Sequence, residues 1–486
     1  MTSIDDARTL VLFFSVTLVL GIIIGLGLGF ALWGIRPPEP RPPTPYWTDE
    51  PWMELYDEPD ELYEPDEEAR PDPLGHLVDE LDIWPARHLI ISVPGRSLDR
   101  ATMDLLREIK PGGVLLLPDN IASRSQTEQL VQQIKEAVGL GTGIADLPLI
   151  AVAQEGGEAN PLALDDAPGA EELAASGNVD EAREAGRRYG EACVRRGIAL
   201  VLAPVLDIVE GERSALTRGR SFGHVPESVI PLAMAFAEGV KEAGALPVGK
   251  YFPGLGVSQD DPEFGFALLL RERRALEPVL QPFQYAVERS IPGLLVGHIT
   301  APALDPEQPT RPASLSPVML AGLLRAQWGY KGVILSDDAN ARAIAATRPP
   351  EAAVVEALQA GADAVLHLDR TPLRLRVACK AIELAVQDGH LSRDQLFESM
   401  RRLESWQSWL RDPHPLWGDT SQSDESATTE EEPVEAPPLR THVVQPGEHL
   451  SGIATRYGVS VSELRILNNL RGDVIHGGQT LAIPTE

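Results

Sequence analysis

Polar and charged residues end several of the short apolar runs in this sequence. Carboxylate, lysine and histidine side chains are the groups that proteins use for proton transfer and nucleophilic attack. A single Asp in such a place often only caps the following helix. Here the placement recurs, which predicts a shared polar pocket made of Gln154, Glu155, Asp207, Lys250, His298, Asp337, Asp338, His367 and Asp369.

One run continues into a glycine-rich loop and then into a group of carboxylates, in the stretch VGKYFPGLGVSQDDPEFG (248–265). Glu263 and Asp261 belong to this group. A carboxyl group acts as an acid/base catalyst near neutral pH only if burial or a neighbouring charge raises its pKa. Asp261 is close enough in sequence to supply such a charge to Glu263.

The elements that must position these residues alternate between residues 76 and 410. Near-continuous runs of Val, Ile and Leu are typical of strands buried on both faces of a parallel sheet, and amphipathic segments separate them. Eight strand–helix units in about 320 residues predict an α/β fold, a (β/α)8 barrel of the TIM type. A doubly wound open sheet is the alternative, but no G-x-G-x-x-G motif follows the first run. The runs begin at His88, Gly112, Leu147, Ile198, Leu246, Gly293, Gly332 and Ala362.

The charge of the chain argues against one class of partner. The 486 residues include 42 Lys and Arg against 72 Asp and Glu, and no basic patch stands out. Nucleic acid is therefore not an expected partner. Two acidic stretches rich in proline, residues 36–75 and 411–440, are expected to form a stalk and a disordered linker. The two cysteines, Cys193 and Cys379, are expected to be buried free thiols.

Residues 9–35 carry no charge and are long enough to cross a bilayer as a helix. We expect a single-pass membrane anchor there, and a cleaved signal peptide is the alternative. The flanking basic residues do not decide the orientation. The expected order is a transmembrane helix over 9–35, a stalk over 36–75, a barrel over 76–410, a linker over 411–440 and a small module over 441–486.

Six motifs of the barrel region resemble those of family 3 glycoside hydrolases and occur in the same order. The resemblance is greatest to the single-barrel bacterial β-N-acetylhexosaminidases that trim cell-wall amino sugars. It implies a retaining mechanism, in which one carboxylate forms a covalent glycosyl-enzyme and a second group protonates the leaving oxygen. No metal or other cofactor is expected. The motifs are AQEGG (153–157), APVLD (203–207), GRSFG (219–223), GKYFPGLG (249–256), PALDPEQP (302–309) and GVILSDD (332–338).

The resemblance also assigns residues. Asp337, the first Asp of the S-D-D motif, falls on the position of the nucleophile. Lys250 and Arg220 fall on positions that hold sugar hydroxyls, and both can donate to hydroxyls. His298 and Gln154 also match substrate-binding positions of the pattern.

Several positions depart from the family pattern. The pattern K-H-F-P-G-H-G, then D-S-H, has histidines where this chain has Tyr251 and Leu255, and its acid/base histidine is replaced by Glu263. The family pattern D-Q-E-G-G-R begins with an Asp that binds the terminal sugar and ends with an Arg. This chain has Ala153 and Glu158 at these two positions.

Two hypotheses follow for the barrel. In the first, Glu263, next to Asp261, takes the place of the histidine, so that Asp337 and Glu263 form the carboxylate pair that most retaining glycosidases use. In the second, the barrel is a catalytically silent cell-wall tether or glycan sensor. The replaced positions favour the second, because each lowers the rate by orders of magnitude unless it is compensated. A different polysaccharide is a third alternative, since Ala153 and Glu158 change the pocket.

Residues 441–486 resemble a LysM domain along their whole length, through PGEHLSGIATRYGV (446–459), LRILNNL (464–470) and IHGGQTLAIP (475–484). The resemblance implies a βααβ unit that binds peptidoglycan or another N-acetylglucosamine-containing glycan in a shallow groove. Loop glycines also serve as simple turn formers. The whole chain is then expected in the cell membrane, with barrel and LysM domain on the extracytoplasmic side, and its oligomeric state stays open. The expected glycan-binding residues are Gly447, Glu448, His449, Leu450 and Ile475.

Overall fold

A computed structural model describes the chain over residues 85–139, 148–210, 219–258, 260–411, 440–445, 448–457, 464, 468 and 475–483. The chain divides into two compact units, one up to Gly418 and the other from Asp419. The expected stalk (36–75) and nearly all of the expected linker (411–440) lie outside the described residues.

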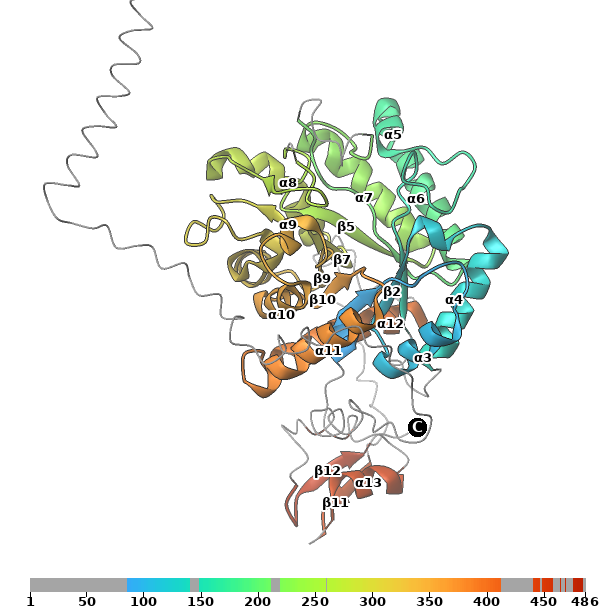
Figure 1. The fold of residues 1–486 in the computed structure, drawn as a ribbon, viewed down its shortest axis with the longest axis vertical. Helices are drawn as coiled ribbons and strands as arrows, with labels where there is room; N and C mark the ends of the chain where they lie inside the picture. The colour runs from blue at the N-terminus through green and yellow to red at the C-terminus, as the bar shows by residue number, and fades with distance from the viewer. Residues whose placement is uncertain are drawn as a thin grey trace, which may run out of the picture. The chain divides into compact units, whose positions relative to one another are not determined.

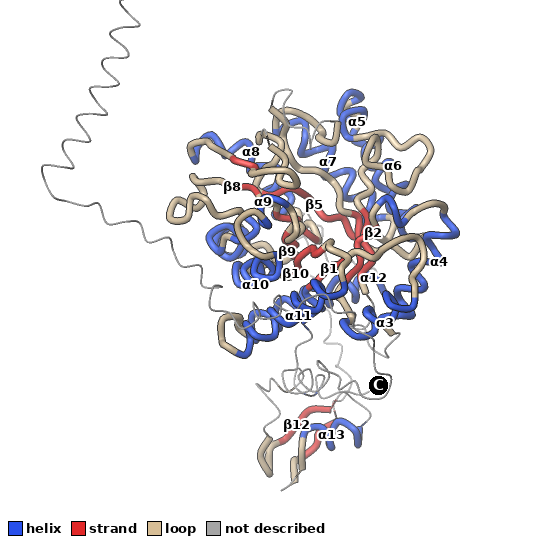
Figure 2. Tube along the Cα trace, in the orientation of Figure 1, coloured by secondary structure: helices blue, strands red, loops and turns tan. Residues whose placement is uncertain are grey.

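The first unit is a closed barrel of eight parallel strands, which appear at the centre of Figure 1 and in red in Figure 2. The strands follow one another around the barrel in chain order, and β10 pairs with β1 to close it. Each of the eight apolar runs contains one strand, so the predicted (β/α)8 barrel is confirmed. The strands are β1 (Leu89–Ile91), β2 (Gly113–Leu116), β3 (Leu149–Val152), β4 (Leu200–Val201), β5 (Leu246–Phe252), β7 (Gly293–Val296), β9 (Val333–Ser336) and β10 (Ala364–His367).

Burial on both faces explains why these strands are apolar throughout. Side chains such as Ile90 and Leu335 fill the interior of the barrel, while their neighbours Ile91 and Ile334 belong to the layer between strands and helices. This alternation is what a strand's twofold side-chain period requires. Two short pieces, β6 (Ala267–Leu268) and β8 (Ile299–Thr300), pair with each other outside the barrel.

Helices surround the barrel, as the blue segments of Figure 2 show. Polar side chains begin several of them: Asp99, Ser123 and Asn178 each accept a hydrogen bond from a backbone N–H of the first turn. The helices are α3 (Arg100–Ile109), α4 (Arg124–Val138), α5 (Ala170–Ser176), α6 (Val179–Val194), α7 (Pro226–Glu242), α8 (Glu277–Glu288), the π-helix η7 (Val318–Gln327), α9 (Arg342–Ala345), α10 (Pro350–Ala360), α11 (Pro372–Gln387) and α12 (Arg393–Arg411), with 3-10 turns η2 (Pro85–His88), η3 (Pro118–Asn120), η5 (Arg273–Leu276) and η6 (Ala313–Leu315).

Helix α12, the last described helix of the first unit, packs against the amino-terminal end of the barrel and closes it. Trp406 is buried among the interior side chains, and its indole N–H donates to the carbonyl of Pro292, just before β7, at 3.0 Å. Gly293 provides the space, since a Cβ there would lie 2.7 Å from the Trp406 ring. The interior is therefore a packed core closed at one end, and the other end is free for a site.

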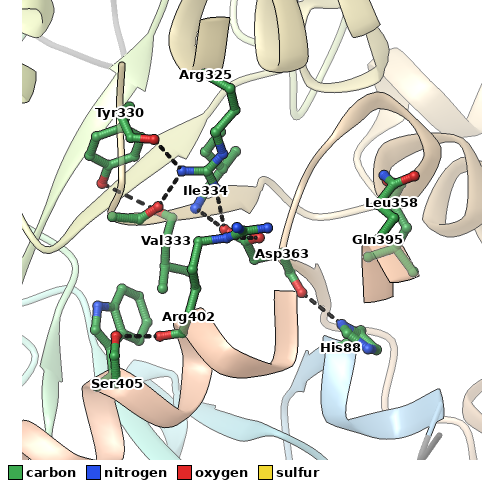
Figure 3. A network of polar contacts seen from close by, with 12 residues as sticks. His88, Arg325, Tyr330, Val333, Ile334, Leu358, Asp363, Gln395, Arg402 and Ser405 are labelled. Atoms are coloured by element: carbon green, nitrogen blue, oxygen red, sulfur yellow. Dashed lines mark hydrogen bonds and ion pairs between the residues drawn. The ribbon is translucent and has the colours of Figure 1, made fainter. Parts of the chain in front are cut away.

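An ion-pair network around Asp363 holds the same end together (Figure 3). Asp363 precedes β10 and is fully buried. Its carboxylate accepts from Arg325 of η7 at 2.5 Å, from Arg402 of α12 at 2.8 Å and from the backbone N–H of Ile334 at 2.8 Å. Its carbonyl lies 2.9 Å from Nδ1 of His88. The carboxylate of Asp363 thus links η7, β9 and α12, and its backbone carbonyl adds η2, the first element of the barrel region.

The expected fold class included a membrane-spanning helix, and this part of the expectation was wrong for the residues that the structure describes. No helix within the described ranges is both long and apolar enough to cross a bilayer. The longest of these described helices, α12, spans 19 residues and carries charges along its length, because it packs one face on the barrel and exposes the other. The segment on which the expectation was based, residues 9–35, lies outside the described residues.

The second unit contains strands β11 (Arg440–Val443) and β12 (Thr480–Ile483), which pair antiparallel, and helix α13 (Leu450–Tyr457). Its core is formed by Val444, Leu450, Ile453, Ala454, Leu464, Leu481 and Ile483. Most of the expected second helix of the βααβ unit lies outside the described residues.

Candidate active site

The carboxyl ends of β5, β7 and β9 bring together three of the predicted site residues. Lys250 lies on β5, His298 follows β7 and Asp337 follows β9, and these strands are neighbours in the barrel. Burial raises the pKa of Asp337, against the opposing effects of His298, the Asp338 N–H and Lys250. Asp337 is therefore a half-buried carboxyl group close to Lys250 and to the ring of His298.

Glu155, at the end of β3, binds both cations of the pocket. Its carboxylate accepts two hydrogen bonds of 2.6 Å from the guanidinium of Arg220, and it is paired with Nζ of Lys250. Burial alone would raise the pKa of Glu155, but Lys250 and Arg220 outweigh it and hold this pKa below its usual value. Arg220 also donates to the hydroxyl of Tyr251 at 2.8 Å. The cations are thus fixed in place before any ligand arrives.

The glycine-rich loop after β5 is pinned by Asp207, at the end of the segment that follows β4. The Asp207 carboxylate accepts from the N–H groups of Tyr251 and Gly256, both at 2.8 Å. Burial raises the pKa of Asp207 to about 6, although these N–H groups act in the opposite direction. Gly256 permits the approach, because a Cβ there would lie 2.2 Å from the carbonyl of Ile208.

The same loop carries Glu263 to the end of β9. The carbonyl of Pro262 accepts from the N–H of Ala343 in α9 at 3.0 Å, and Asp261 accepts from the N–H of Glu263 at 2.9 Å. Desolvation raises the pKa of Glu263 to about 7, with further contributions from the charges of Asp337, Asp338 and Asp261. Glu263 is exposed, and the charge of Asp337 is one of the causes of its raised pKa.

Other predicted site residues bind the protein itself. His298 is buried, with Nδ1 2.7 Å from Oγ of Ser314 and Nε2 2.7 Å from the carbonyl of Asp338. Gln154 is also buried, and it binds Asn160 and the N–H of Leu162. In this arrangement both side chains shape the pocket walls and have few groups left for a sugar.

The remaining strand-end residues serve the scaffold. Asp338 accepts from the N–H of Leu368 and from Asn340, which joins the ends of β9 and β10. Asp369 accepts from the N–H of Thr371 at 2.8 Å, just before α11. His367 is buried, and burial lowers its pKa. Within the described ranges, no cluster of three or more His, Cys, Asp or Glu residues could hold a metal ion.

The positions that depart from the family pattern differ in their environment. Leu255 is buried in the core between barrel and helices, so it presents no polar group to the pocket. Ala153 is half-buried and packs against the barrel interior, while Glu158 is exposed. A sugar hydroxyl near Ala153 therefore meets a methyl group.

In the C-terminal unit, Glu448 is turned toward its own domain. It accepts from the N–H of Gln445 at 2.9 Å, lies 2.7 Å from Nε2 of His442 and pairs with Arg456 at 2.6 Å. These contacts, led by the Gln445 N–H, lower its pKa to about 2. His449 is exposed, Leu450 belongs to the core and Ile475 packs against it. Gly447 lies outside the described residues.

Sequence reasoning missed two features of the site. It placed Glu155, Lys250 and Arg220 among the candidate residues, but it did not predict that the carboxylate of Glu155 binds both cations. It also missed the contact between Pro262 and Ala343, which brings together segments far apart in the chain. No local pattern indicates such a contact.

Comparison with known proteins agrees with the fold of the barrel and with the presence of a C-terminal LysM domain. The profile of the glycosyl hydrolase family 3 N-terminal domain matches residues 86–406, and that of the LysM domain matches residues 442–484. A β-hexosaminidase of Idiomarina loihiensis is 31% identical over 57% of this chain and 82% of its own length. The β-hexosaminidase LpqI of Mycobacterium tuberculosis is 32% identical over 57% of this chain and 71% of its own length.

A solved family 3 β-N-acetylglucosaminidase from Paenibacillus sp. str. FPU-7 superposes with a TM-score of 0.64 at 27% identity. The match covers 71% of this chain and 65% of that protein.

Proposed function

This chain belongs to glycosyl hydrolase family 3, and from that premise we propose that its barrel is an active β-N-acetylhexosaminidase that acts on cell-wall glycan. The chain combines a hexosaminidase-like barrel with a LysM module, which supports a glycosidase that also binds glycan. Because the proposed substrate is cell-wall glycan, we predict that the enzyme acts on the extracytoplasmic side of the membrane.

The proposed reaction has two steps and retains the anomeric configuration. Asp337 attacks the anomeric carbon and forms a glycosyl ester, while the protonated carboxyl of Glu263 gives its proton to the leaving oxygen. Glu263, now ionised, then takes a proton from water. The water oxygen attacks the same carbon, the ester bond breaks, and Asp337 is restored as a carboxylate.

The observation that carries this proposal is the hydrogen bond from the N–H of Ala343 to the carbonyl of Pro262, 3.0 Å long, which keeps the Glu263 loop beside the segment that follows Asp337. A group that must act as acid and then as base works best with a pKa near the working pH. The pKa of Glu263, about 7, meets this requirement, and the Pro262–Ala343 bond holds its loop against the segment after the nucleophile.

The pre-arranged cations supply the proposed grip on the sugar. Lys250 and Arg220 are held by Glu155, so they can donate to hydroxyls without first losing side-chain freedom. Tyr251 stands where the family pattern has histidine, and its ring lies near both cations, 5.2 Å from Nζ of Lys250 and 5.6 Å from Arg220.

The LysM module is proposed to bind the N-acetylglucosamine-containing polymer on which the barrel acts. A linked module raises the local concentration of the glycan at the barrel without any new contact. Weak binding by each part is then sufficient to keep the enzyme at the wall.

A catalytically silent glycan binder is the second candidate. It is favoured by one specific observation: Leu255 is buried and Ala153 offers only a methyl group, so two positions that are polar in the family pattern add no hydrogen bonds here. The two candidates differ in a single measurable property, which is turnover.

The test is hydrolysis of 4-nitrophenyl N-acetyl-β-glucosaminide by the full-length chain, beside Asp337→Ala and Glu263→Gln. We expect turnover by the unmodified chain and a loss of at least about a thousandfold in Asp337→Ala, because no nucleophile remains. Absence of turnover in the unmodified chain, with binding to peptidoglycan intact, would favour the silent binder.

A further inference from the structure

A groove of about 760 Å³ lies on the outside of the barrel, between α8 and η7. Figure 1 shows α8 at the periphery of the fold. None of Asp337, Glu263 and Glu155 lines this groove, so it is separate from the candidate active site. Its volume is in the range of pockets that bind small molecules or short segments of a polymer.

The floor of the groove has the amphipathic character that suits a sugar ring. Trp328 is half-buried, and it packs edge-to-face on Phe252 with ring centroids 5.8 Å apart and an interplanar angle of 85°. Tyr285 of α8 is also half-buried and lines the groove, and the guanidinium of Arg289 lies 5.4 Å from its ring centroid. Half-buried aromatic side chains provide apolar contact next to water.

The walls carry free hydrogen-bonding groups. Gln281 and Gln327 are exposed on the two sides, and neither side chain has a partner among the described residues. Each amide offers both donors and acceptors, which matches the hydroxyl and acetamido groups of an amino sugar. Gln284 of α8 also lines the groove and donates to Glu288 at 3.2 Å.

The charges along the groove favour a neutral ligand. Arg273 and Arg274 are balanced by Glu277 and Glu288, so the lining has no net charge. An acidic or a basic peptide would find no complementary field there. A neutral polymer with many hydroxyl groups meets both the aromatic floor and the amide walls.

We propose that this groove is a second glycan-binding site on the barrel, which takes a short stretch of N-acetylglucosamine polymer outside the active site. The ligand class rests on the proposed function. The groove would hold a neighbouring segment of the polymer that the active site trims, and Trp328 and Tyr285 are the contact surface, with Gln281 and Gln327 as hydrogen-bonding groups.

Tryptophan fluorescence provides a selective test. The chain has 8 Trp, and none of them lies in the LysM region (441–486). Glycan binding to the LysM domain is therefore not expected to change the tryptophan fluorescence. The full-length chain with Asp337→Asn, which prevents hydrolysis, is titrated with chitopentaose. We expect a saturable fluorescence change that is absent in Asp337→Asn with Trp328→Phe. Adding Gln281→Ala and Gln327→Ala to Asp337→Asn should weaken the apparent affinity at least tenfold.

The matched control is Gln132→Ala, which removes an exposed glutamine from α4 on another face and should leave the titration unchanged. With Asp337 intact, the Gln281→Ala/Gln327→Ala chain should hydrolyse the small aryl glycoside as the unmodified chain does. No saturable change, or one that persists without Trp328 or without both glutamines, would overturn the second site. Hydrolysis by the unmodified chain is measured separately, so failure of the groove and failure of the proposed enzyme are distinguishable.

A synthetic peptide of residues 36–75 is the remaining probe, because proline-rich segments also dock on aromatic grooves. Displacement of chitopentaose by an excess of this peptide would replace the glycan proposal with an intramolecular one. An unchanged chitopentaose titration supports the glycan proposal.

Discussion

The backbone N–H of Ala343 donates to the carbonyl of Pro262 at 3.0 Å, and this bond holds the Glu263 loop beside the segment that follows Asp337. It joins the β5–α8 connection to α9. Glu263, the proposed acid/base, thus lies in a loop that is fixed at both ends, by Asp207 near its start and by Ala343 near Glu263.

Glu263→Gln should lower turnover in a way that depends on the leaving group. Loss of a general acid costs about 10²–10⁴-fold when the leaving oxygen needs a proton, and much less for an activated phenol. We expect a larger loss with a disaccharide than with 4-nitrophenyl N-acetyl-β-glucosaminide. Azide, which needs no general base, should restore part of the aryl glycoside rate and give a β-glycosyl azide. An equal loss on both substrates with no azide effect would contradict the assigned role.

The pH dependence of kcat/KM should show a basic limb near the pKa of Glu263. The first step needs the protonated carboxyl, and raising the pH through about 7 ionises it, so kcat/KM should fall about tenfold per pH unit above that value. Gln does not titrate, and the limb should be absent in Glu263→Gln. A limb that persists in this variant would assign the titration to another group. The measurement is kcat/KM across pH 5 to 9 with both chains.

Glu155→Gln should destabilise the barrel. The side chains of Glu155 and Lys250 are 5% and 2% exposed, so removing the carboxylate charge leaves buried cations without a counter-ion. Breaking such a buried pair costs about 3–5 kcal/mol of unfolding free energy. Tyr251→Phe is the matched control: it removes one hydrogen bond from Arg220 and keeps the ring, for about 1 kcal/mol. Urea unfolding of both variants measures the difference, and equal values would contradict the central role of Glu155.

Asp363→Asn should also destabilise the fold, because it weakens the ion-pair network at the amino-terminal end of the barrel, opposite the candidate active site. The variant leaves Arg325 and Arg402 without the charge that both of them bind, and we expect a loss of about 3–5 kcal/mol. Below its unfolding temperature, the variant should keep the KM of the unmodified chain, since Asp363 is remote from the strand ends that form the pocket. A changed KM in the folded protein would show that the two ends are coupled.

The sequence predicted the barrel well because each strand is apolar on both faces and each run is bounded by polar residues. From the order of the motifs it assigned Asp337 as the nucleophile and Glu263 as the acid/base, and both roles stay predictions. It could not predict that His298 has both ring nitrogens bound by Ser314 and Asp338, because these contacts depend on how loops fold back over strand ends. The same limit applies to Glu448, whose inward contacts come from a strand and a helix.

The plug formed by Trp406 has a consequence for biosynthesis. β1 leaves the ribosome early, but it must pair with β10, and Leu89 meets Val365 only after most of the barrel has been translated. Contacts of such long sequence separation form late, because the loop they close is costly in entropy. A nascent chain that stops before Trp406 exposes the aliphatic interior of the barrel at one end. Truncated products of this gene are therefore expected to be bound by chaperones and degraded, even when every residue of the active site has been made.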